Sequence, residues 1–278
     1  MKSHLLIFVL LFCGCSGGPI PKAGPVISQS VPSQSRTAIP SNRVKPKNEI
    51  QTKLEIPAFS ESEDIVSHIG FTASYNHEML IPNWVAYELT AEECEGTLKG
   101  KESFCWDPEL KGRQPNREDY KNDAQWDRGH MAPKADMKWS IQAYEESYFL
   151  SNICPQNRTF NSGSWASTEK FARRIARKYG RAYIVCGPIV TVQQYGTLGT
   201  PKIVIPDAFF KAVLIKKETS YSAIAFIMQN KPVTQDLKGC SMSVDKLEAI
   251  IGMDLFYNLK SSIQKEIEST VTYSDWGI

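Results

Sequence analysis

The sequence has almost no net charge. Its 32 lysines and arginines stand against 30 aspartates and glutamates, which leaves a formal net charge of +2. This balance does not by itself indicate a nucleic-acid partner, because phosphate binding depends on local rather than overall positive charge. The rest of the composition, 42% hydrophobic and 22% charged, is that of an ordinary globular chain. Any nucleic-acid site must therefore come from a local cluster of basic residues.

The sequence also lacks a pair of cysteines separated by two residues, the spacing typical of structural zinc sites, so we predict no zinc site. Of its seven cysteines, two lie within the first 15 residues and five remain. An odd number means that at least one thiol stays free or pairs between chains. Cys94 and Cys105 flank the turn-rich stretch "EGTLKGKES", and we predict that they form a disulfide in an oxidising compartment.

No apolar run near the start is long enough to cross a membrane. The run at residues 5–12 is well short of the roughly 20 apolar residues that a spanning helix needs. A lysine precedes it and small residues follow, which predicts an export signal over residues 1–15. Gly14 before Cys15 resembles a bacterial lipoprotein cleavage site, although Phe12 is an unusual residue at the third position upstream of Cys15. We predict an exported protein, either periplasmic, secreted, or anchored to a membrane through a lipidated Cys15.

Aromatic residues are nearly absent from residues 16–60, which hold seven of the 16 prolines. Such a stretch cannot bury enough apolar surface to offset the entropy lost on ordering, so it is predicted to be a flexible linker. The remaining residues, 61–278, show no internal repeat and are predicted to form one folded domain.

Within that domain, several runs of β-branched and aromatic residues predict strands. These runs are "NWVAYEL", "RAYIVCGPIV", "PKIVIP", "FFKAVLI" and "YSAIAFIM". Helical spacing predicts one helix that starts after Ser162 or Ser164 and ends at Gly180, and another that starts after Ser243. Most strands are too closely spaced for helical crossovers. The fold class predicted is α+β, with an antiparallel sheet as its core.

Histidine is scarce: only four occur, and His4 falls in the export signal. His130 stands in the stretch "DRGHMAP", where Asp127 can orient a ring or fix a turn. Arg128 offers a planar donor group for phosphate, and Gly129 permits the close approach of a substrate backbone. A single histidine is more often structural than catalytic, so partners for His130 must be found elsewhere.

A second stretch, "SNICPQNRTFNSGSWASTEKFARR", supplies candidate partners. Asn152, Asn161 and Glu169 follow one another at spacings of nine and eight residues, and Arg173 lies one helical turn after Glu169. Taken singly, these residues read as turn asparagines and a surface ion pair. Together they bring an amide, a carboxylate and a guanidinium near a helix start, where a hard cation and a phosphate can both be held.

The same region is locally basic, with one acid, Glu169, among residues 152–181. Its basic residues are Arg158, Lys170, Arg173, Arg174, Arg177, Lys178 and Arg181. A basic helix is usually only a solvated face. Beside this candidate site, we interpret it as a surface that follows a phosphate backbone.

Six stretches, "NWVAYELT", "DRGHMAP", "YFLSNICPQ", "FNSGSWASTEK", "YIVCGPIV" and "VDKLEAIIGMDLF", together resemble the DNA/RNA non-specific endonucleases of the ββα-metal (His-Me finger) type, which include endonuclease G. The resemblance covers most of residues 70–260. It implies that His130 is the general base, that Asn161 binds magnesium directly and that Glu169 holds metal-bound water. Asn152 would be an active-site hydrogen-bonding group.

The resemblance further implies that Arg128 and Arg173 contact phosphate, and we extend that role to Arg174 and Arg177 as substrate-binding residues. Family members often carry a further arginine shortly before the equivalent of "WDPEL". Here that neighbourhood reads "KGKESFCWDPEL", so the role stays unassigned among Lys99, Lys101, Arg113 and Arg117.

The function predicted is magnesium-dependent endonucleolytic hydrolysis of DNA and RNA to 5′-phosphate products, with Mn²⁺ as a substitute ion and a homodimer left open. Two alternatives remain: a nucleic-acid-binding module without catalysis, and a thiol hydrolase that uses Cys154 with His130.

Overall fold

The computed structural model describes residues 53–120 and 123–278. The chain divides into two units, residues 1–42 and 43–278, and every described residue belongs to the second. The predicted export signal, Cys15 and most of the predicted linker lie outside the described residues. No helix of the described part has the length and apolar character needed to span a membrane.

The folded part begins before residue 61, so the predicted end of the linker is wrong. Ile56 and Phe59 are buried, and the Phe59 ring lies 5.8 Å from that of Trp84. The backbone N–H of Ala58 also donates to the Asp254 carbonyl at 2.8 Å. The short run "IPAF" therefore supplies enough apolar surface to fix this segment on the domain.

A seven-stranded antiparallel sheet forms the core, in the order β1-β2-β3-β6-β9-β10-β11. Its strands are β1 (Asp64–Ser67), β2 (Thr72–Asn76), β3 (Ile81–Thr90), β6 (Arg181–Ile189), β9 (Ala208–Lys216), β10 (Tyr221–Gln229) and β11 (Ser241–Met242). Two small sheets, β4 (Trp126–His130) with β5 (Ile153–Asn157) and β7 (Thr197–Leu198) with β8 (Ile203–Val204), complete the strands of the described part.

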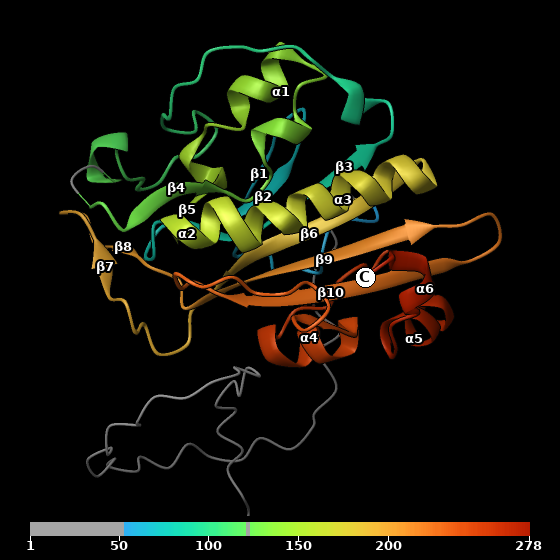
Figure 1. Cartoon of the computed structure of the whole chain (residues 1–278). Helices are drawn as coiled ribbons and strands as arrows, with labels where there is room; N and C mark the ends of the chain where they lie inside the picture. Colours follow the sequence, from blue (N-terminus) through green and yellow to red (C-terminus); the bar gives the residue numbers. More distant parts are fainter. Residues whose placement is uncertain (1–52, 121–122) are drawn as a thin grey trace, which may run out of the picture. The chain divides into compact units, whose positions relative to one another are not determined.

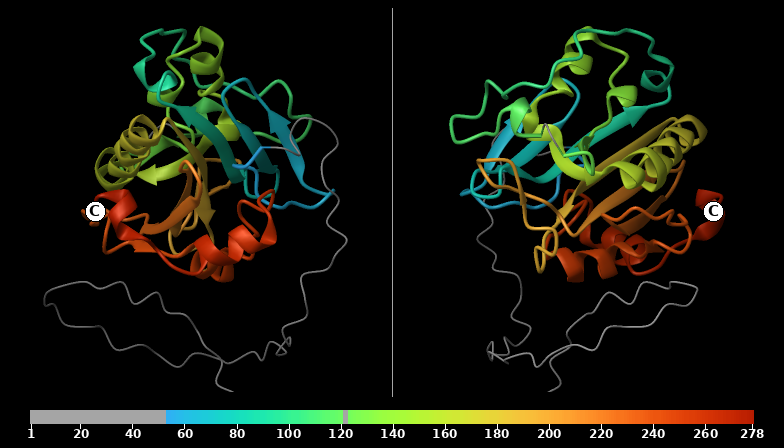
Figure 2. Two further views of the ribbon diagram at one scale, coloured as in Figure 1. Left: turned by 90° about the vertical axis from the view of Figure 1, so that its right-hand side faces the viewer. Right: turned by 60° about the vertical axis from the view of Figure 1, so that its left-hand side comes forward.

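Helices cover the sheet on both faces (Figures 1 and 2). The long helix α3 (Ala166–Tyr179) packs across β6 and β9, while α4 (Val244–Ile251) and α5 (Ser261–Glu268) pack against β10 from the other side. The shorter helices are α1 (Ile141–Glu146), α2 (Arg158–Phe160) and α6 (Tyr273–Trp276). The predicted α+β class with an antiparallel core is confirmed.

The coverage of both faces explains the strand sequences. Along β9, "AFFKAVLIK", every residue except the last is buried. A sheet with one face in water would alternate apolar and polar residues, whereas a sheet covered on both faces has continuous apolar runs. The runs that predicted strands at β3, β6, β9 and β10 are confirmed, and "PKIVIP" contains the short strand β8.

The start of the long helix was predicted incorrectly. Helical structure begins at Arg158, because the Asn157 side chain accepts from the backbone N–H groups of Thr159 (3.1 Å) and Phe160 (3.4 Å). Ser162 and Ser164 cap nothing and lie inside the continuous helix. Gly180 ends it in the left-handed conformation (φ 83°), as predicted, and Ser243 caps α4, as predicted.

The predicted disulfide is also wrong, because all five described cysteines are free. The Cys94 thiol lies against α3, 3.8 Å from the Arg173 carbonyl. Cys105 instead forms an isolated parallel bridge with Phe149, its N–H donating to the Tyr148 carbonyl at 3.3 Å. Closeness in sequence did not bring the two thiols together, because the intervening loop is fixed along other elements.

Candidate active site

The candidate residues are carried by a two-stranded hairpin followed by a helix. Strand β4 pairs antiparallel with β5, from Trp126 opposite Asn157 to His130 opposite Ile153. Strand β5 then runs directly into α2, a π-helical turn (Asn161–Trp165) and α3. This ββα unit places "DRGH" on one strand and the second sequence stretch on the adjoining strand and helix.

The π-helical turn explains the spacing of Asn161 and Glu169. Eight residues of regular α-helix would separate the two side chains by about 80° around the axis. A π-turn inserts about one extra residue, so the separation acts like seven residues, which is close to two full turns. Asn161 and Glu169 therefore lie on the same side of the helix, two turns apart.

Asp127 orients the amide of Asn161. The Asn161 Nδ2 donates to Asp127 Oδ2 at 3.3 Å, and Arg158 Nε donates to Asp127 Oδ1 at 3.1 Å. No other hydrogen bond holds the Asn161 side chain among the described residues, so its Oδ1 is free to bind a ligand. Asp127 was predicted to fix a turn or orient the imidazole of His130, and the structure gives it this other role.

The imidazole of His130 lies among aromatic rings. Its ring centroid is 5.2 Å from that of Tyr148 and 5.6 Å from that of Phe104, and its Nε2 is buried without a hydrogen-bond partner. Burial and the positive charge of Lys134 lower the His130 pKa to about 3, against the opposing effect of Glu102. The ring is therefore in its neutral form at pH 7.

Arg128 lies two residues before His130 on β4, and both side chains contact Phe104. The Arg128 guanidinium carbon lies 4.6 Å from the centre of the Phe104 ring. The guanidinium makes no ion pair or hydrogen bond among the described residues, so its donors are available to a phosphate.

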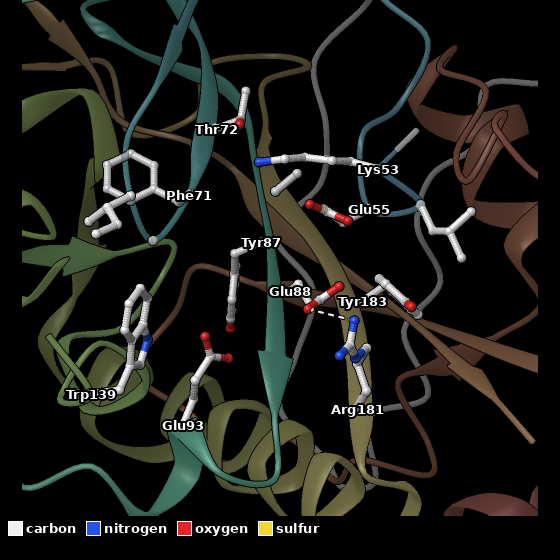
Figure 3. Close-up of a pocket in the computed structure, with 14 residues that line it drawn as sticks. Lys53, Glu55, Phe71, Thr72, Tyr87, Glu88, Glu93, Trp139, Arg181 and Tyr183 are labelled. Carbon is white, nitrogen blue, oxygen red and sulfur yellow. Dashed lines mark ion pairs between the residues drawn. The ribbon is translucent and has the colours of Figure 1, made fainter. Parts of the chain in front are cut away.

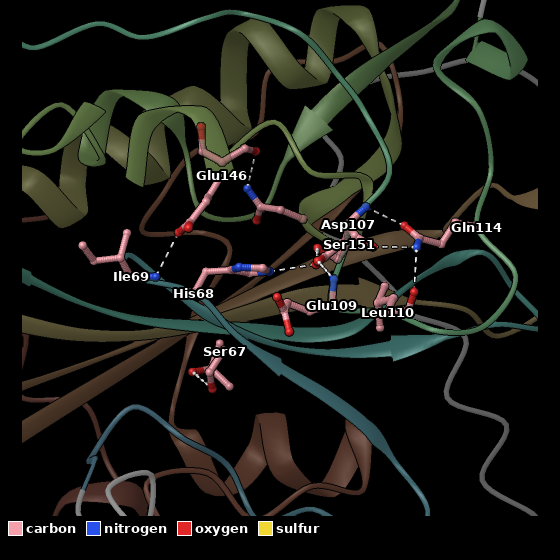
Figure 4. A network of polar contacts seen from close by, with 12 residues as sticks. Ser67, His68, Ile69, Asp107, Glu109, Leu110, Gln114, Glu146 and Ser151 are labelled. Carbon is pink, nitrogen blue, oxygen red and sulfur yellow. Dashed lines mark hydrogen bonds and ion pairs between the residues drawn. The ribbon is translucent and has the colours of Figure 1, made fainter. Parts of the chain in front are cut away.

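A polar network holds the loop that carries Phe104 (Figure 4). The buried carboxylate of Asp107 bonds His68 Nε2 at 2.7 Å and accepts from the Ser151 hydroxyl at 2.5 Å. The Asp107 backbone N–H also donates to the Gln114 side chain at 2.8 Å. Ser151 immediately precedes Asn152 and β5, so the network fixes the Phe104 loop against the hairpin.

Asn152 is fully buried, and its amide is bound to the backbone. Its Oδ1 accepts from the Ala132 N–H, and its Nδ2 donates to the carbonyls of Ala132 and Ser147, all at 2.8 Å. These bonds hold the chain just after His130. The structure gives Asn152 a positioning role through these backbone bonds, and its predicted role as an active-site hydrogen-bonding group stays a prediction.

Glu169 has no hydrogen-bond or ion-pair partner among the described residues. Burial raises its pKa to about 7, with Asp136 adding to the rise and with Lys211 and Arg173 opposing it. Lys211 is fully buried on β9, its ammonium 4.3 Å from the centre of the Trp165 ring and without a hydrogen-bond partner. A carboxylate so placed gains from a cation bound nearby.

The arginines of α3, which were predicted to form one basic surface, each contact a different partner within the protein. Arg173 forms an ion pair with the buried Asp136, and its side chain is only 16% exposed. Arg174 donates to the Trp276 carbonyl at 2.8 Å, and Arg177 pairs with Glu95 at 2.7 Å. The helix therefore does not present one basic face, and the predicted phosphate contacts of these arginines stay predictions.

Of the residues proposed for the unassigned phosphate role, Arg113 donates to the Pro201 carbonyl and Arg117 pairs with Glu118. Sequence reasoning missed Lys134, which follows "DRGHMAP" directly. Lys134 lies 5.6 Å from the Tyr148 ring centre and pairs with Glu102 at 3.2 Å. It is the cation whose charge acts on His130, and its place directly after the motif was the available signal.

Cys154 cannot serve as a nucleophile. Cys154 is fully buried, and burial raises the pKa of its thiol well above the ordinary value. In the pairing of β4 with β5 it lies opposite Gly129, whereas His130 lies opposite Ile153. A nucleophilic cysteine needs an accessible, stabilised thiolate. The thiol-hydrolase alternative is therefore wrong.

A separate cavity of about 520 Å³ lies elsewhere (Figure 3). The Glu88–Arg181 ion pair (2.9 Å), Lys53, Glu55 and Glu93 line it. None of the predicted site residues faces it, and its carboxylates disfavour a phosphate.

A hairpin and helix that bear a histidine, an asparagine and a glutamate in this arrangement define the ββα-metal class of nuclease. A family model described as DNA/RNA non-specific endonuclease matches residues 50–262. The mitochondrial nuclease of Saccharomyces cerevisiae is 30% identical over 77% of this chain and 73% of its own length. The chain belongs to the DNA/RNA non-specific endonuclease family, whose members are metal-dependent hydrolytic nucleases.

Two further comparisons agree. A nuclease of Nostoc sp. is 27% identical over 97% of each chain. The solved structure of EndoG in complex with EndoGI covers 79% of this chain and 96% of that one, with a TM-score of 0.69 and 21% identity, which shows a shared fold.

Gly129 offers a test of the hairpin. A Cβ at this position would lie 2.0 Å from Oε1 and 2.4 Å from Cγ of Gln156, a fully buried side chain that would have to shift within the core. Close approach was predicted to serve the substrate, but here it serves packing. We expect Gly129→Ala to lower the free energy of unfolding by about 1–3 kcal/mol in urea denaturation.

Gly163→Ala is the matched control, because no atom lies within 4 Å of the added Cβ. It should be neutral or stabilising by up to about 1 kcal/mol. Equal stability of the two variants would show that Gly129 is not constrained by Gln156.

Proposed function

We propose that this nuclease cuts DNA and RNA in a reaction that depends on a divalent metal, with magnesium as the working ion and His130 as the general base, and that it leaves 5′-phosphate ends. One observation carries the proposal. A neutral imidazole, an uncommitted guanidinium at Arg128 and two unpartnered oxygen ligands, from Asn161 and Glu169, belong to one ββα unit.

The residues present fit magnesium. Its preferred ligands are oxygens, and it keeps several waters, so few protein ligands suffice. The Asn161 amide is turned by Asp127 so that its oxygen remains unbonded. This oxygen would bind the ion directly, and Glu169 would hold it through water. A bound ion would polarise the phosphate and neutralise charge on the departing oxygen.

His130, Arg128 and Asn152 supply the remaining functions: proton transfer, phosphate binding and positioning. His130 accepts a proton from the attacking water, since its imidazole is in the neutral form that a general base requires. Arg128 donates to the non-bridging phosphate oxygens, and the Phe104 ring holds its guanidinium in place. Asn152 keeps the chain after His130 in position through its three backbone bonds.

This scheme supports a broad substrate range. No step uses the 2′-hydroxyl, so the sugar can be ribose or deoxyribose. The groups named act on phosphate, whereas sequence is read through base edges. We therefore propose cleavage of single- and double-stranded substrates with preferences set only by groove shape and stiffness. Export, lipidation of Cys15 and a homodimer remain proposals that rest on the sequence alone.

His130→Ala should lower the rate of plasmid and RNA cleavage by about 10²- to 10⁴-fold, because the general base is lost. Substrate affinity, measured in EDTA by fluorescence anisotropy, should change little. His77→Ala is the matched control, since this imidazole bonds Asp64 and the Arg113 carbonyl instead. It should cleave at nearly the parent rate.

Two results would overturn this account. A His130→Ala rate within tenfold of the parent would remove the assigned base. A parent protein that binds DNA in magnesium without cutting it would favour the binding module instead.

Arg128→Ala should weaken substrate binding and flatten the dependence of log affinity on log salt by about one unit, because one phosphate contact is lost. Arg177→Ala should change this slope less, because Arg177 is already paired with Glu95. A larger effect of Arg177 than of Arg128, measured between roughly 50 and 200 mM salt, would place the phosphate path along α3 instead.

A further inference from the structure

A cluster of three carboxylates lies on the face of the sheet opposite α3. Asp245 and Glu248 belong to α4, and Glu268 ends α5; one carboxylate oxygen from each lies within 4.8 Å of the others. The two helices lie together beneath β10, whereas α3 and the ββα unit lie on the other side (Figures 1 and 2). The cluster is therefore distinct from the candidate active site.

Glu268 has few partners for a buried carboxylate: among the described residues, a side-chain hydrogen bond with Gln264 is the one that acts on it. Glu268 is only 4% exposed, and its Oε1 is buried with no hydrogen-bond partner. No ion pair among the described residues involves any of the three carboxylates. A buried charge without a partner is costly, so this oxygen indicates a missing ligand.

The neighbouring groups increase the cost. The Glu248 Oε1 accepts from the Leu255 N–H at 2.7 Å, but this is one neutral donor. Asp254 adds a further carboxyl group near the cluster. Carboxylates packed this closely repel one another when ionised, and a bound cation would relieve that repulsion.

We propose that Asp245, Glu248 and Glu268 form a calcium-binding site that joins α4 to α5. Calcium takes six to eight oxygen ligands in flexible geometry, and two oxygens that share one ion at about 2.3–2.6 Å lie at most about 5 Å apart. The cluster meets this condition. Asp245 is exposed, which gives the ion and its waters a route in.

The proposed calcium site has a structural role and takes no part in catalysis. The loop between the two helices carries Asp254, whose carbonyl accepts from Ala58 of the N-terminal segment at 2.8 Å. An ion that fixes α4 against α5 also fixes this loop and the segment attached to it.

The test uses the full chain with Asn161→Ala, which removes the proposed ligand at the active site. Calcium chloride is titrated in magnesium-free buffer at pH 7.5, roughly neutral, and followed by calorimetry and thermal unfolding. At 100 times Kd, calcium should raise Tm by about 5–10 °C. Glu268→Gln in the same background should abolish both the binding heat and this shift.

Two further variants complete the test. Glu266→Gln, on the exposed side of α5, should bind calcium as the parent does. Asp245→Asn, at an exposed position, should weaken binding without unfolding the protein. In calcium-free buffer, Glu268→Gln should be at least as stable as its parent, because it removes repulsion. The proposal is wrong if calcium produces no Tm shift, or if Glu268→Gln keeps the full shift; the carboxylates would then be held by shared protons.

Discussion

The attachment of strand β4 to the helix that follows β5 is the constraint on which the site depends. The Trp165 indole donates to the His130 carbonyl at 3.0 Å, and the Asn161 amide donates to Asp127 at 3.3 Å. One bond fixes the backbone of the proposed base, and the other turns the proposed metal ligand. Both cross between the same strand and the same helix, so the two groups are positioned relative to each other as a unit.

Burial acts in opposite directions on the two ionisable groups of this unit. It lowers the pKa of His130 to about 3 and raises that of Glu169 to about 7, so both groups favour their neutral forms. For His130 this form is the one that accepts a proton. It also ties His130 to stability: because its pKa lies below the ordinary 6.5, its contribution is lost as the pH falls from 6.5 toward 3.

Much of the fold could be predicted from the sequence, because long apolar runs and helix ends are local signals. The strands β3, β6, β9 and β10 and the helix stop at Gly180 belong to this class. The start of the helix at Arg158 could not be predicted from periodicity, since a π-turn interrupts the regular spacing. The prediction of a Cys94–Cys105 disulfide failed because the path of a loop depends on tertiary contacts, which the sequence does not reveal.

The candidate site also has features that the sequence predicts and features that it does not. Motif spacing predicted that His130, Asn161 and Glu169 belong to one site, and the structure carries them on β4 and on the helix that follows β5, but spacing carries no information about burial. The partners of Arg173, the backbone bonds of Asn152 and the position of Lys211 under Trp165 all arise from residues distant in sequence. Gly129 was assigned to the substrate for the same reason, since Gln156 lies on the neighbouring strand.

The most direct test of the account is to locate the metal itself, by anomalous diffraction from crystals of the full chain soaked in Mn²⁺. We expect an anomalous peak within coordination distance of Asn161 Oδ1, with Glu169 linked to the ion through water and with His130 unligated. An ion bound by the His130 imidazole, or the absence of a peak near Asn161 in a crystal that leaves the site accessible, would contradict it.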